Sequence, residues 1–223
     1  MHFTIIPIKS LADGKKRLNP ILSPTQRRDL ILTSLQDVLQ AATNSKLTDQ
    51  TVLVTSDPEI VTISKTWAYP KLTYLIEPTS QGTHHAVQYA IHWSQEQAAS
   101  SILIIPADIP LIGFNDIDEI IGLGKSKNTI ILIPSQRKEG TNAFFHPHPP
   151  FFPVWYGPDS YQKNLVSITN LNLPFIILER AKFALDIDLK EDLAKLLQLN
   201  DNSLTKQLIQ NFALNIKEKK CMK

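Results

Sequence analysis

Short apolar runs alternate along this chain with longer segments in which apolar residues recur every three or four positions. The short runs are rich in β-branched residues, which is typical of strands, and the longer segments have the period of amphipathic helices. A chain in which strands and helices alternate predicts an α/β fold, with a mostly parallel central sheet and helices on both of its faces. The expected strands cover residues 4–8, 51–55, 72–76, 101–105, 129–133 and 175–178.

The clearest helix begins after Ser23 and Pro24, which suit the N-cap and the first helical position. Leu30, Ile31 and Leu35 follow with the spacing of one buried helix face. Further helices are expected over residues 59–67, 83–95, 117–123, 161–171 and 191–199.

Two stretches lack such a pattern. Proline and aromatic residues crowd residues 144–156, which predicts a semirigid loop whose His146 and His148 face solvent. Residues 201–223 are polar and predict a tail, helical or disordered, after a single domain over residues 1–200. A length of 223 residues with 43% hydrophobic content is enough for one sizeable core, and no linker or repeat divides the chain.

The composition narrows the choice of partners. A formal net charge of +2 is too small to predict a nucleic acid or a membrane as the main partner, whereas a small phosphorylated ligand is compatible with it. The single cysteine, Cys221, excludes a disulfide framework within the chain, and no signal peptide is expected. We therefore expect a cytoplasmic protein and leave its oligomeric state open, a homodimer included.

Two acidic sites stand at the ends of apolar runs that lie far apart in the sequence. Asp108 follows the run at residues 102–105, and Asp186 and Asp188 follow the run that begins at Phe183. Ligands bind at the carboxyl ends of the strands in open α/β sheets, so these carboxylates can meet in one cleft. Asp186 and Asp188 project to the same side, because side chains alternate in an extended segment.

Carboxylates in such a cleft suit Mg²⁺, which prefers oxygen ligands and often takes only one or two carboxylates together with water and phosphates. Asp108 alone has another interpretation, as the end of a strand and the cap of a following helix. Glu191 and Asp192 stand at the start of a helix, where negative charge is favourable, and are interpreted as capping groups.

A cationic cluster follows the first strand. Lys15, Lys16 and Arg17 are consecutive, and Lys9 precedes them in the same loop. Such a group can neutralise a triphosphate and stabilise charge on a transferring phosphorus. The alternative is a solvated charged loop. The loop is neither a Walker A motif nor a dinucleotide fingerprint, because the glycines of both are absent.

Two further loops suit an acidic ligand. Residues 140–143, Gly-Thr-Asn-Ala, offer amides and the Thr141 hydroxyl in an expected turn, and residues 156–161 combine Gly157 and Ser160 at the start of a helix. The free N–H groups of a helix N-terminus readily bind phosphate or carboxylate. Each loop alone is equally typical of an ordinary turn.

The order of these motifs resembles that of the 2-phospho-L-lactate guanylyltransferases and their phosphoenolpyruvate-using relatives, which make a precursor of the deazaflavin redox coenzyme. The resemblance covers about residues 3–195. The matching stretches are Pro7-Ile8-Lys9 with Lys15, Arg17 and Leu18, then Leu22-Ser23-Pro24 with Arg27, Asp37-Val38-Leu39, Pro106-Ala107-Asp108-Ile109-Pro110, Gly140-Thr141-Asn142-Ala143, Gly157-Pro158 with Ser160, and Leu185-Asp186-Ile187-Asp188 with Glu191-Asp192-Leu193.

The resemblance implies a single-domain, Rossmann-like nucleotidyltransferase fold and a Mg²⁺-dependent guanylyltransferase. GMP would pass from GTP to phosphoenolpyruvate, 2-phospholactate or 3-phosphoglycerate with release of pyrophosphate. It implies Mg²⁺ ligands at Asp108, Asp186 and Asp188, and acceptor contacts at Thr141, Gly157 and Ser160. It also implies catalytic roles for Lys15, Arg17 and Asp108, and nucleotide contacts at Lys9, Lys15, Arg17, Gly82 and His84.

The chain departs from the family pattern in one segment. The family commonly has Gly-Leu-Asn near the nucleotide, where this chain has Gly82-Thr83-His84-His85. The alternative for both histidines is that they only begin a helix. His84 replaces the asparagine, and Asn164 stands where relatives often have a histidine. Two other functions therefore stay open: a nucleotidyltransferase with another nucleotide or a sugar-phosphate acceptor, and a catalytically silent relative that binds a nucleotide or a partner protein.

Overall fold

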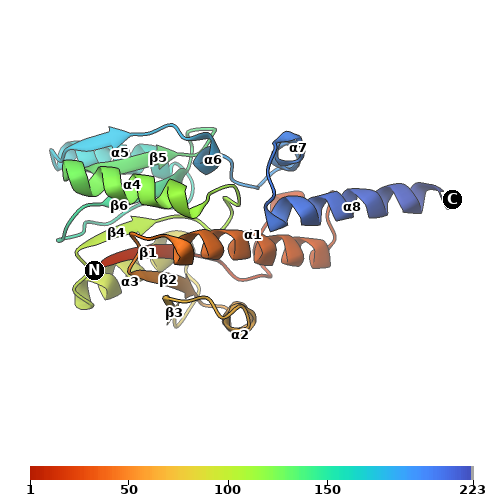
Figure 1. The fold of residues 1–223 in the computed structure, drawn as a ribbon, viewed down its shortest axis with the longest axis horizontal. Coiled ribbons are helices and arrows are strands. Elements are labelled where there is room, and N and C mark those ends of the chain that lie inside the picture. The colour runs from red at the N-terminus through yellow and green to blue at the C-terminus, as the bar shows by residue number, and fades with distance from the viewer. Residues whose placement is uncertain (222–223) are drawn as a thin grey trace.

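Seven strands form one sheet in the computed structural model, which describes the backbone of residues 1–221 and side-chain burial up to residue 212 (Figure 1). The strand order is β3-β2-β1-β4-β6-β5-β7. All pairings are parallel except those of β6, which runs antiparallel to both β4 and β5. The strands are β1 (His2–Pro7), β2 (Gln50–Thr55), β3 (Leu72–Ile76), β4 (Ser101–Ile104), β5 (Ile130–Pro134), β6 (Thr141–His146) and β7 (Phe175–Ile177).

Helix α1 begins where local side chains satisfy free backbone N–H groups. At the start of α1, Ser23 Oγ accepts a hydrogen bond from Gln26 N, and the Gln26 side chain accepts one from Ser23 N. This capping box, with Pro24 at the first position, confirms the predicted start. The helices are η1 (Lys16–Leu18, a 3-10 turn), α1 (Pro24–Asn44), α2 (Pro58–Lys65), α3 (Thr83–Glu96), α4 (Phe114–Lys127), α5 (Ser160–Asn170), α6 (Ala181–Ala184), α7 (Lys190–Gln198) and α8 (Leu204–Cys221).

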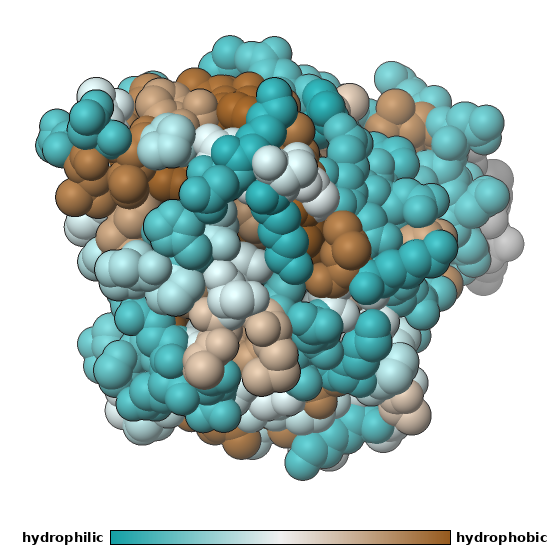
Figure 2. Space-filling view, turned by 60° about the vertical axis from the view of Figure 1, so that its left-hand side comes forward, coloured by the Kyte–Doolittle hydropathy of each residue, from teal (hydrophilic) through white to brown (hydrophobic). Residues whose placement is uncertain are grey.

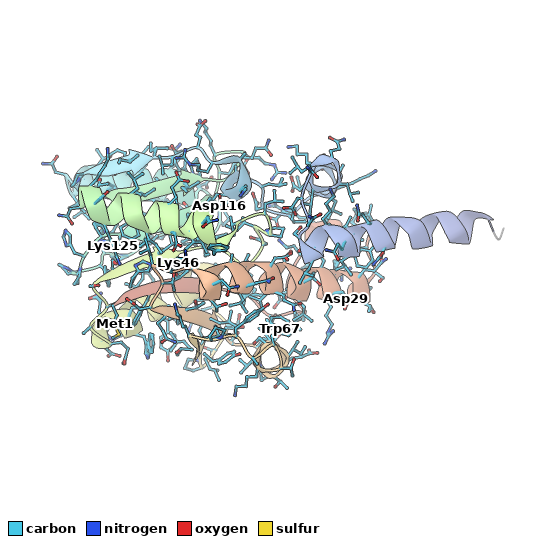
Figure 3. All side chains as sticks on the ribbon, in the orientation of Figure 1. Met1, Asp29, Lys46, Trp67, Asp116 and Lys125 are labelled. Atoms are coloured by element: carbon cyan, nitrogen blue, oxygen red, sulfur yellow. The ribbon has the colours of Figure 1, made fainter. Side chains whose placement is uncertain are left out.

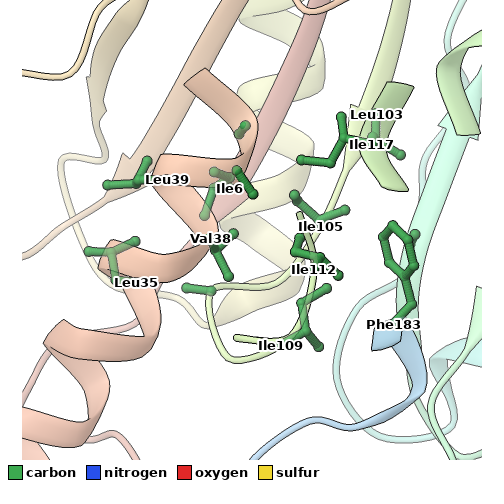
Figure 4. Packing of buried hydrophobic residues seen from close by; sticks show 14 of the residues in the cluster. Ile6, Leu35, Val38, Leu39, Leu103, Ile105, Ile109, Ile112, Ile117 and Phe183 are labelled. Carbon is green, nitrogen blue, oxygen red and sulfur yellow. The ribbon is translucent and has the colours of Figure 1, made fainter. Parts of the chain in front are cut away.

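Helices cover both faces of the sheet, as the sequence pattern predicted. Successive residues of β1 face opposite ways, so Ile5 packs with α3 and α5 on one face while Ile6 packs with α1 and α4 on the other. Figure 4 shows the second of these layers, in which Leu35 and Val38 of α1 lie with Ile6 of β1 and Ile105 just after β4. The single α/β domain with a mostly parallel sheet is thereby confirmed.

β6 was not predicted. Residues 140–143 were expected to form a turn and residues 144–156 a loop, whereas Thr141 to His146 form a strand buried at every position. Gly140 and Asn142 are typical turn residues, and the prolines that follow the strand favoured a loop. The prediction was wrong for residues 141–146, while residues 147–156 have no helix or strand.

His146 is also a correction, because its side chain is buried rather than exposed to solvent. It lies in β6 with its ring 5.1 Å from that of Phe151 and 4.8 Å from that of Phe152, between centroids. Burial, and to a smaller extent the neighbouring His148, lowers the pKa of the His146 imidazole to about 4. His148 is exposed, as expected.

The neutral form of His146 should therefore make stability depend on pH. Its folded-state pKa lies below the ordinary value of 6.5, so the unfolded chain binds more protons between those two values. The wild type should lose about 3 kcal/mol of unfolding free energy from this group as the pH falls through that window. Denaturant unfolding across the window should show a smaller loss for His146→Phe. His92→Gln, at an exposed position, is the control, and identical pH slopes for wild type and His146→Phe would refute the assignment.

A third, smaller cluster of apolar side chains lies beyond the end of the sheet. It joins Leu18, Leu111, Leu185 and Ile187 to residues of α1, α7 and α8. The first half of α8 packs along α1, with Ile209 buried, and Figure 1 shows the rest of the helix extending past it. The division of the chain at residue 200 stays a prediction. The side chains of Cys221 and of the lysines at 217, 219, 220 and 223 lie outside those described.

Hydrophilic side chains cover most of the face seen in Figure 2, and hydrophobic ones gather along its upper edge. Asp116, labelled in Figure 3, caps α4 through Gly113 N at 2.7 Å and pairs with Lys182 of α6 at 2.8 Å. This ion pair connects α6 with the start of α4. Within residues 1–221, no helix combines the length and apolarity needed to cross a bilayer.

Candidate functional site

A cavity of about 500 Å³ opens at the carboxyl ends of β1 and β4. Ligands bind at this edge in open α/β sheets, and the volume suits a small-molecule ligand. The cavity also reaches the first residues of α3 and α5 and the segment between α6 and α7. The predicted site residues that line it are Lys9, Lys15, Arg17, Asp108, Thr141, Gly157, Ser160, Asp186 and Asp188.

The two acidic segments meet as the sequence predicted. Ile187 N donates a hydrogen bond to Asp108 O at 3.1 Å, which ties the segment after α6 to the end of β4. Leu185 and Ile187 are buried in the third apolar cluster, so the alternating Asp186 and Asp188 face the cavity. The packing of Leu185 and Ile187 therefore turns the side chains of Asp186 and Asp188 toward the cavity.

Lys15 lies between the two acidic segments. Its ammonium is 2.6 Å from Asp108 Oδ2 and 2.9 Å from Asp188 Oδ1, and its side chain is only 7% exposed. Burial alone would lower the pKa of Lys15, but the two carboxylates raise it above its ordinary range. In turn the Lys15 ammonium holds the pKa of the Asp188 carboxyl below its ordinary value. Lys15 is therefore charged at neutral pH.

The Lys15 backbone is strained in a way that directs its side chain. Its φ is +54°, in the left-handed region that non-glycine residues seldom adopt. Leu18 follows at the end of η1, fully buried in the third cluster. The 3-10 turn thus anchors Leu18 in the core while Lys15 reaches inward to the carboxylates.

Of the three carboxylates, Asp186 is the one whose negative charge is least balanced by its neighbours. Burial first, and then the nearby Asp108 and Asp188 carboxylates, raise the pKa of Asp186. Asn142 Nδ2 donates to its Oδ1 at 3.3 Å and also donates to Phe183 O at 2.8 Å. Asn142 thus fixes both Asp186 and the short helix before it.

Clustered carboxylates of this kind fit a divalent cation that prefers oxygen, and Asp108 and Asp188 add to the effect of burial in raising the pKa of Asp186. Within the described part of the chain, however, no three acidic, histidine or cysteine side chains are arranged as a preformed metal site. Mg²⁺ commonly takes only one or two carboxylates and completes its shell with water and phosphates. The residues therefore fit an ion that arrives with a triphosphate.

Thr141 and Ser160 lie together on another wall of the cavity. Thr141 N donates to Ser160 Oγ at 3.0 Å, and Thr141 Oγ1 accepts from Asn164 Nδ2 at 3.0 Å. Gly157 has φ +100°, which favours glycine and lets the backbone turn into α5. The three predicted acceptor contacts are thus brought to one wall.

The predicted nucleotide contacts are only partly brought together. Lys9 and Arg17 line the cavity with exposed side chains, whereas Gly82 and His84 are not among its lining residues, although Thr83 between them is. The His84 ring stacks on that of Trp155 at 4.4 Å between centroids and an interplanar angle of 5°. The binding roles of Gly82 and His84 stay predictions.

Three lining or supporting residues were missed. Asn142 lies in the stretch 140–143, but the sequence predicted no role for its side chain. Asn164 stood out only because relatives often have a histidine at that position. Arg137 also lines the cavity, and its Nη2 pairs with Asp192 Oδ1 at 2.7 Å. No signal in the sequence connects Arg137 with Asp192, because they are 55 positions apart. Asp192 is confirmed as a capping group, since it accepts from Leu189 N at 2.7 Å.

Comparison with protein families gives one match that spans nearly the whole chain. Residues 2–223 match the family described as guanylyl transferase CofC like. A protein of Methanocaldococcus vulcanius named 2-phospho-L-lactate guanylyltransferase is 30% identical over 96% of this chain and 93% of its own length. A protein of Thermobaculum terrenum named phosphoenolpyruvate guanylyltransferase is 29% identical over 90% of this chain and 85% of its own length.

Solved structures resemble this one in fold. A Desulfovibrio desulfuricans protein assigned to the nucleotide-diphospho-sugar transferases matches with a TM-score of 0.78 at 16% identity, over 97% of each chain. A 4-diphosphocytidyl-2C-methyl-D-erythritol synthase matches with a TM-score of 0.56 at 13% identity, over 87% of this chain and 96% of its own. At these identities the similarity concerns the fold.

Proposed function

Because this chain belongs to the guanylyl transferase CofC like family, we propose that it transfers GMP from GTP to a small phosphorylated three-carbon acid. The acceptor would be phosphoenolpyruvate, 2-phospholactate or 3-phosphoglycerate, and pyrophosphate would be released. Each of these acids carries a phosphate and a carboxylate. The product would serve as a precursor of the deazaflavin coenzyme.

The convergence of Lys15, Asp108, Asp186 and Asp188 in one cavity is the observation that supports the proposal most strongly. A transferase that handles a triphosphate needs cations for the phosphates and carboxylates for Mg²⁺. A relative that had lost catalysis would have no need to keep three carboxylates in one cavity, two of them paired with a buried ammonium. The same arrangement therefore weighs against the silent-relative hypothesis.

In the proposed reaction a phosphate oxygen of the acceptor attacks the α-phosphorus of GTP. A new bond forms between that oxygen and the α-phosphorus, and the bond to the bridging oxygen breaks so that pyrophosphate leaves. The attacking oxygen is already ionised at neutral pH, so the chain needs no general base. Catalysis then rests on positioning and on neutralisation of charge.

The residues of the cavity divide between these tasks. Lys15 and Arg17 bring positive charge to the leaving phosphates, and Thr141, Gly157 and Ser160 orient the acceptor. Asp108, Asp186 and Asp188 would hold Mg²⁺, which supplies charge neutralisation on the phosphates when bound. Lys9 stands at the exposed rim, where it can attract the anionic nucleotide.

Release of pyrophosphate tests the proposal. Purified protein should release pyrophosphate from GTP only when Mg²⁺ and one of the three acids are both present. The same assay with ATP, CTP and UTP measures donor choice, and a sugar phosphate in place of the acid tests the alternative acceptor. Release that requires no acid, or release only with a sugar phosphate, would contradict the proposal.

A further inference from the structure

Asn164 is a fully buried polar residue on α5, behind the cavity wall that carries Thr141. Its side chain makes three hydrogen bonds. Oδ1 accepts from Trp155 N at 2.7 Å, while Nδ2 donates to Trp155 O at 2.9 Å and to Thr141 Oγ1 at 3.0 Å. One amide thus connects the segment before α5 with the first residue of β6.

The orientation of the Asn164 amide is fixed by its partners. The Trp155 N–H requires an acceptor, which only Oδ1 can supply, and the Trp155 carbonyl requires a donor, which only Nδ2 can supply. Nδ2 is therefore the atom that faces Thr141. A hydrogen bond between Nδ2 and a hydroxyl oxygen has a single direction, because the amide nitrogen donates and does not accept.

The Thr141 hydroxyl consequently has its hydrogen left to donate. It accepts from Asn164, and among the described residues no acceptor for its own hydrogen is present. The Ser160 hydroxyl likewise accepts a hydrogen bond, from Thr141 N, and has its own hydrogen left to donate. Both residues line the cavity, so two hydroxyl hydrogens are available there to an anion.

We infer that Asn164 is a positioning residue for the acceptor: it makes the Thr141 hydroxyl a hydrogen-bond donor to the anionic acid and holds residues 155–160 against that wall. The inference rests on the proposed function. Asn164 acts through Thr141 and does not touch the reacting atoms. Its loss should weaken acceptor binding and leave GTP binding unchanged.

A double-mutant cycle with Thr141 tests the inference. Asn164→Asp keeps the size and the acceptor for Trp155 N, but at mildly alkaline pH its carboxylate accepts from Thr141 and withdraws the hydroxyl hydrogen. The KM for phosphoenolpyruvate, or for whichever acid the wild type uses, should rise about tenfold to a hundredfold, as for one lost hydrogen bond to a charged group. In a Thr141→Val background, the same change should raise that KM less than twofold, by roughly the error of an additive cycle.

The outcomes separate three cases. Absence of wild-type turnover with any acid would refute the proposed function itself. Turnover in the wild type with an unchanged acceptor KM in Asn164→Asp, or with equal rises in the acceptor and GTP KM, would overturn the inference about Asn164. The inference would also be overturned if the KM increases of Asn164→Asp and Thr141→Val multiplied in the double variant. Ser167→Ala on the same helix, which removes only a bond to Lys163 O, is the matched control.

Hydrogen exchange without substrate tests the second part of the inference, that Asn164 holds residues 155–160 against the wall. Asn164→Leu removes all three hydrogen bonds at similar volume, so hydrogen exchange at the Trp155 amide should accelerate at least about tenfold. Exchange in β1 should stay unchanged. Trp155 exchange equal to that of the wild type would show that Asn164 does not hold this segment.

Discussion

Replacing Asp108 with asparagine should reduce GMP transfer by roughly a hundredfold to a thousandfold, which is the cost of removing one preorganised group that acts on the charge of the transition state. The folded structure should persist, because the Asp108 side chain is 29% exposed and Lys15 keeps its contact with Asp188. The measurement is kcat for pyrophosphate release at saturating GTP and acceptor, together with the thermal midpoint of each protein.

The control for this change is Glu96→Gln, which removes a carboxylate at the exposed end of α3 and should leave turnover as it is. A raised Mg²⁺ requirement in Asp108→Asn would support its role as a ligand. Near-normal turnover in Asp108→Asn would show that this carboxylate only ends a strand and pairs with Lys15.

Lys15→Met should have the second large effect, because it changes both catalysis and stability. Removing the ammonium leaves Asp108 and Asp188 beside Asp186 without their partner. We expect a loss of about 1–3 kcal/mol of unfolding free energy at neutral pH, below the range for a fully buried pair since both carboxylates are about one-third exposed. Turnover should fall by roughly a hundredfold or more if Lys15 also stabilises the leaving phosphates.

The pH dependence identifies the cause of that instability. Lys15 lowers the pKa of Asp188, so its contribution is present above the ordinary aspartate pKa and is lost as the pH falls through the lowered one. The deficit of Lys15→Met should therefore be largest at neutral pH and shrink in acid. Denaturant unfolding of wild type, Lys15→Met and the exposed control Lys127→Met measures it. A deficit that stays constant with pH would mean lost packing rather than lost charge pairing.

The sequence predicted the layered α/β fold because periodicity is a local property. Residues 4–8 form a short apolar run rich in isoleucine and residues 24–44 show the helical period, and the structure has a strand and a helix there. β6 was missed because its first residues have the composition of a turn and the strand passes into proline-rich sequence. The antiparallel pairing of β6 with β4 joins residues 40 to 44 positions apart, which no local pattern carries.

The acidic part of the site was predictable for the same reason. Alternation placed Asp186 and Asp188 on one side of an extended segment, and the rule for strand ends placed Asp108 opposite them. The bridge from Lys15 to both acidic segments was not predictable, since it spans 93 and 173 positions. Asn164 shows the same limit, because an asparagine in a helix gives no indication that its amide joins the segment before α5 to β6.

The product itself tests the central claim most directly. Mass spectrometry and ³¹P NMR of a complete reaction with GTP, Mg²⁺ and the active acid should show a diphosphate that links GMP to the acid, formed in equal amount with pyrophosphate. Formation of GDP with an acid that has gained a second phosphoryl group, or of GMP without any acid-linked product, would contradict transfer of the guanylyl group by this site.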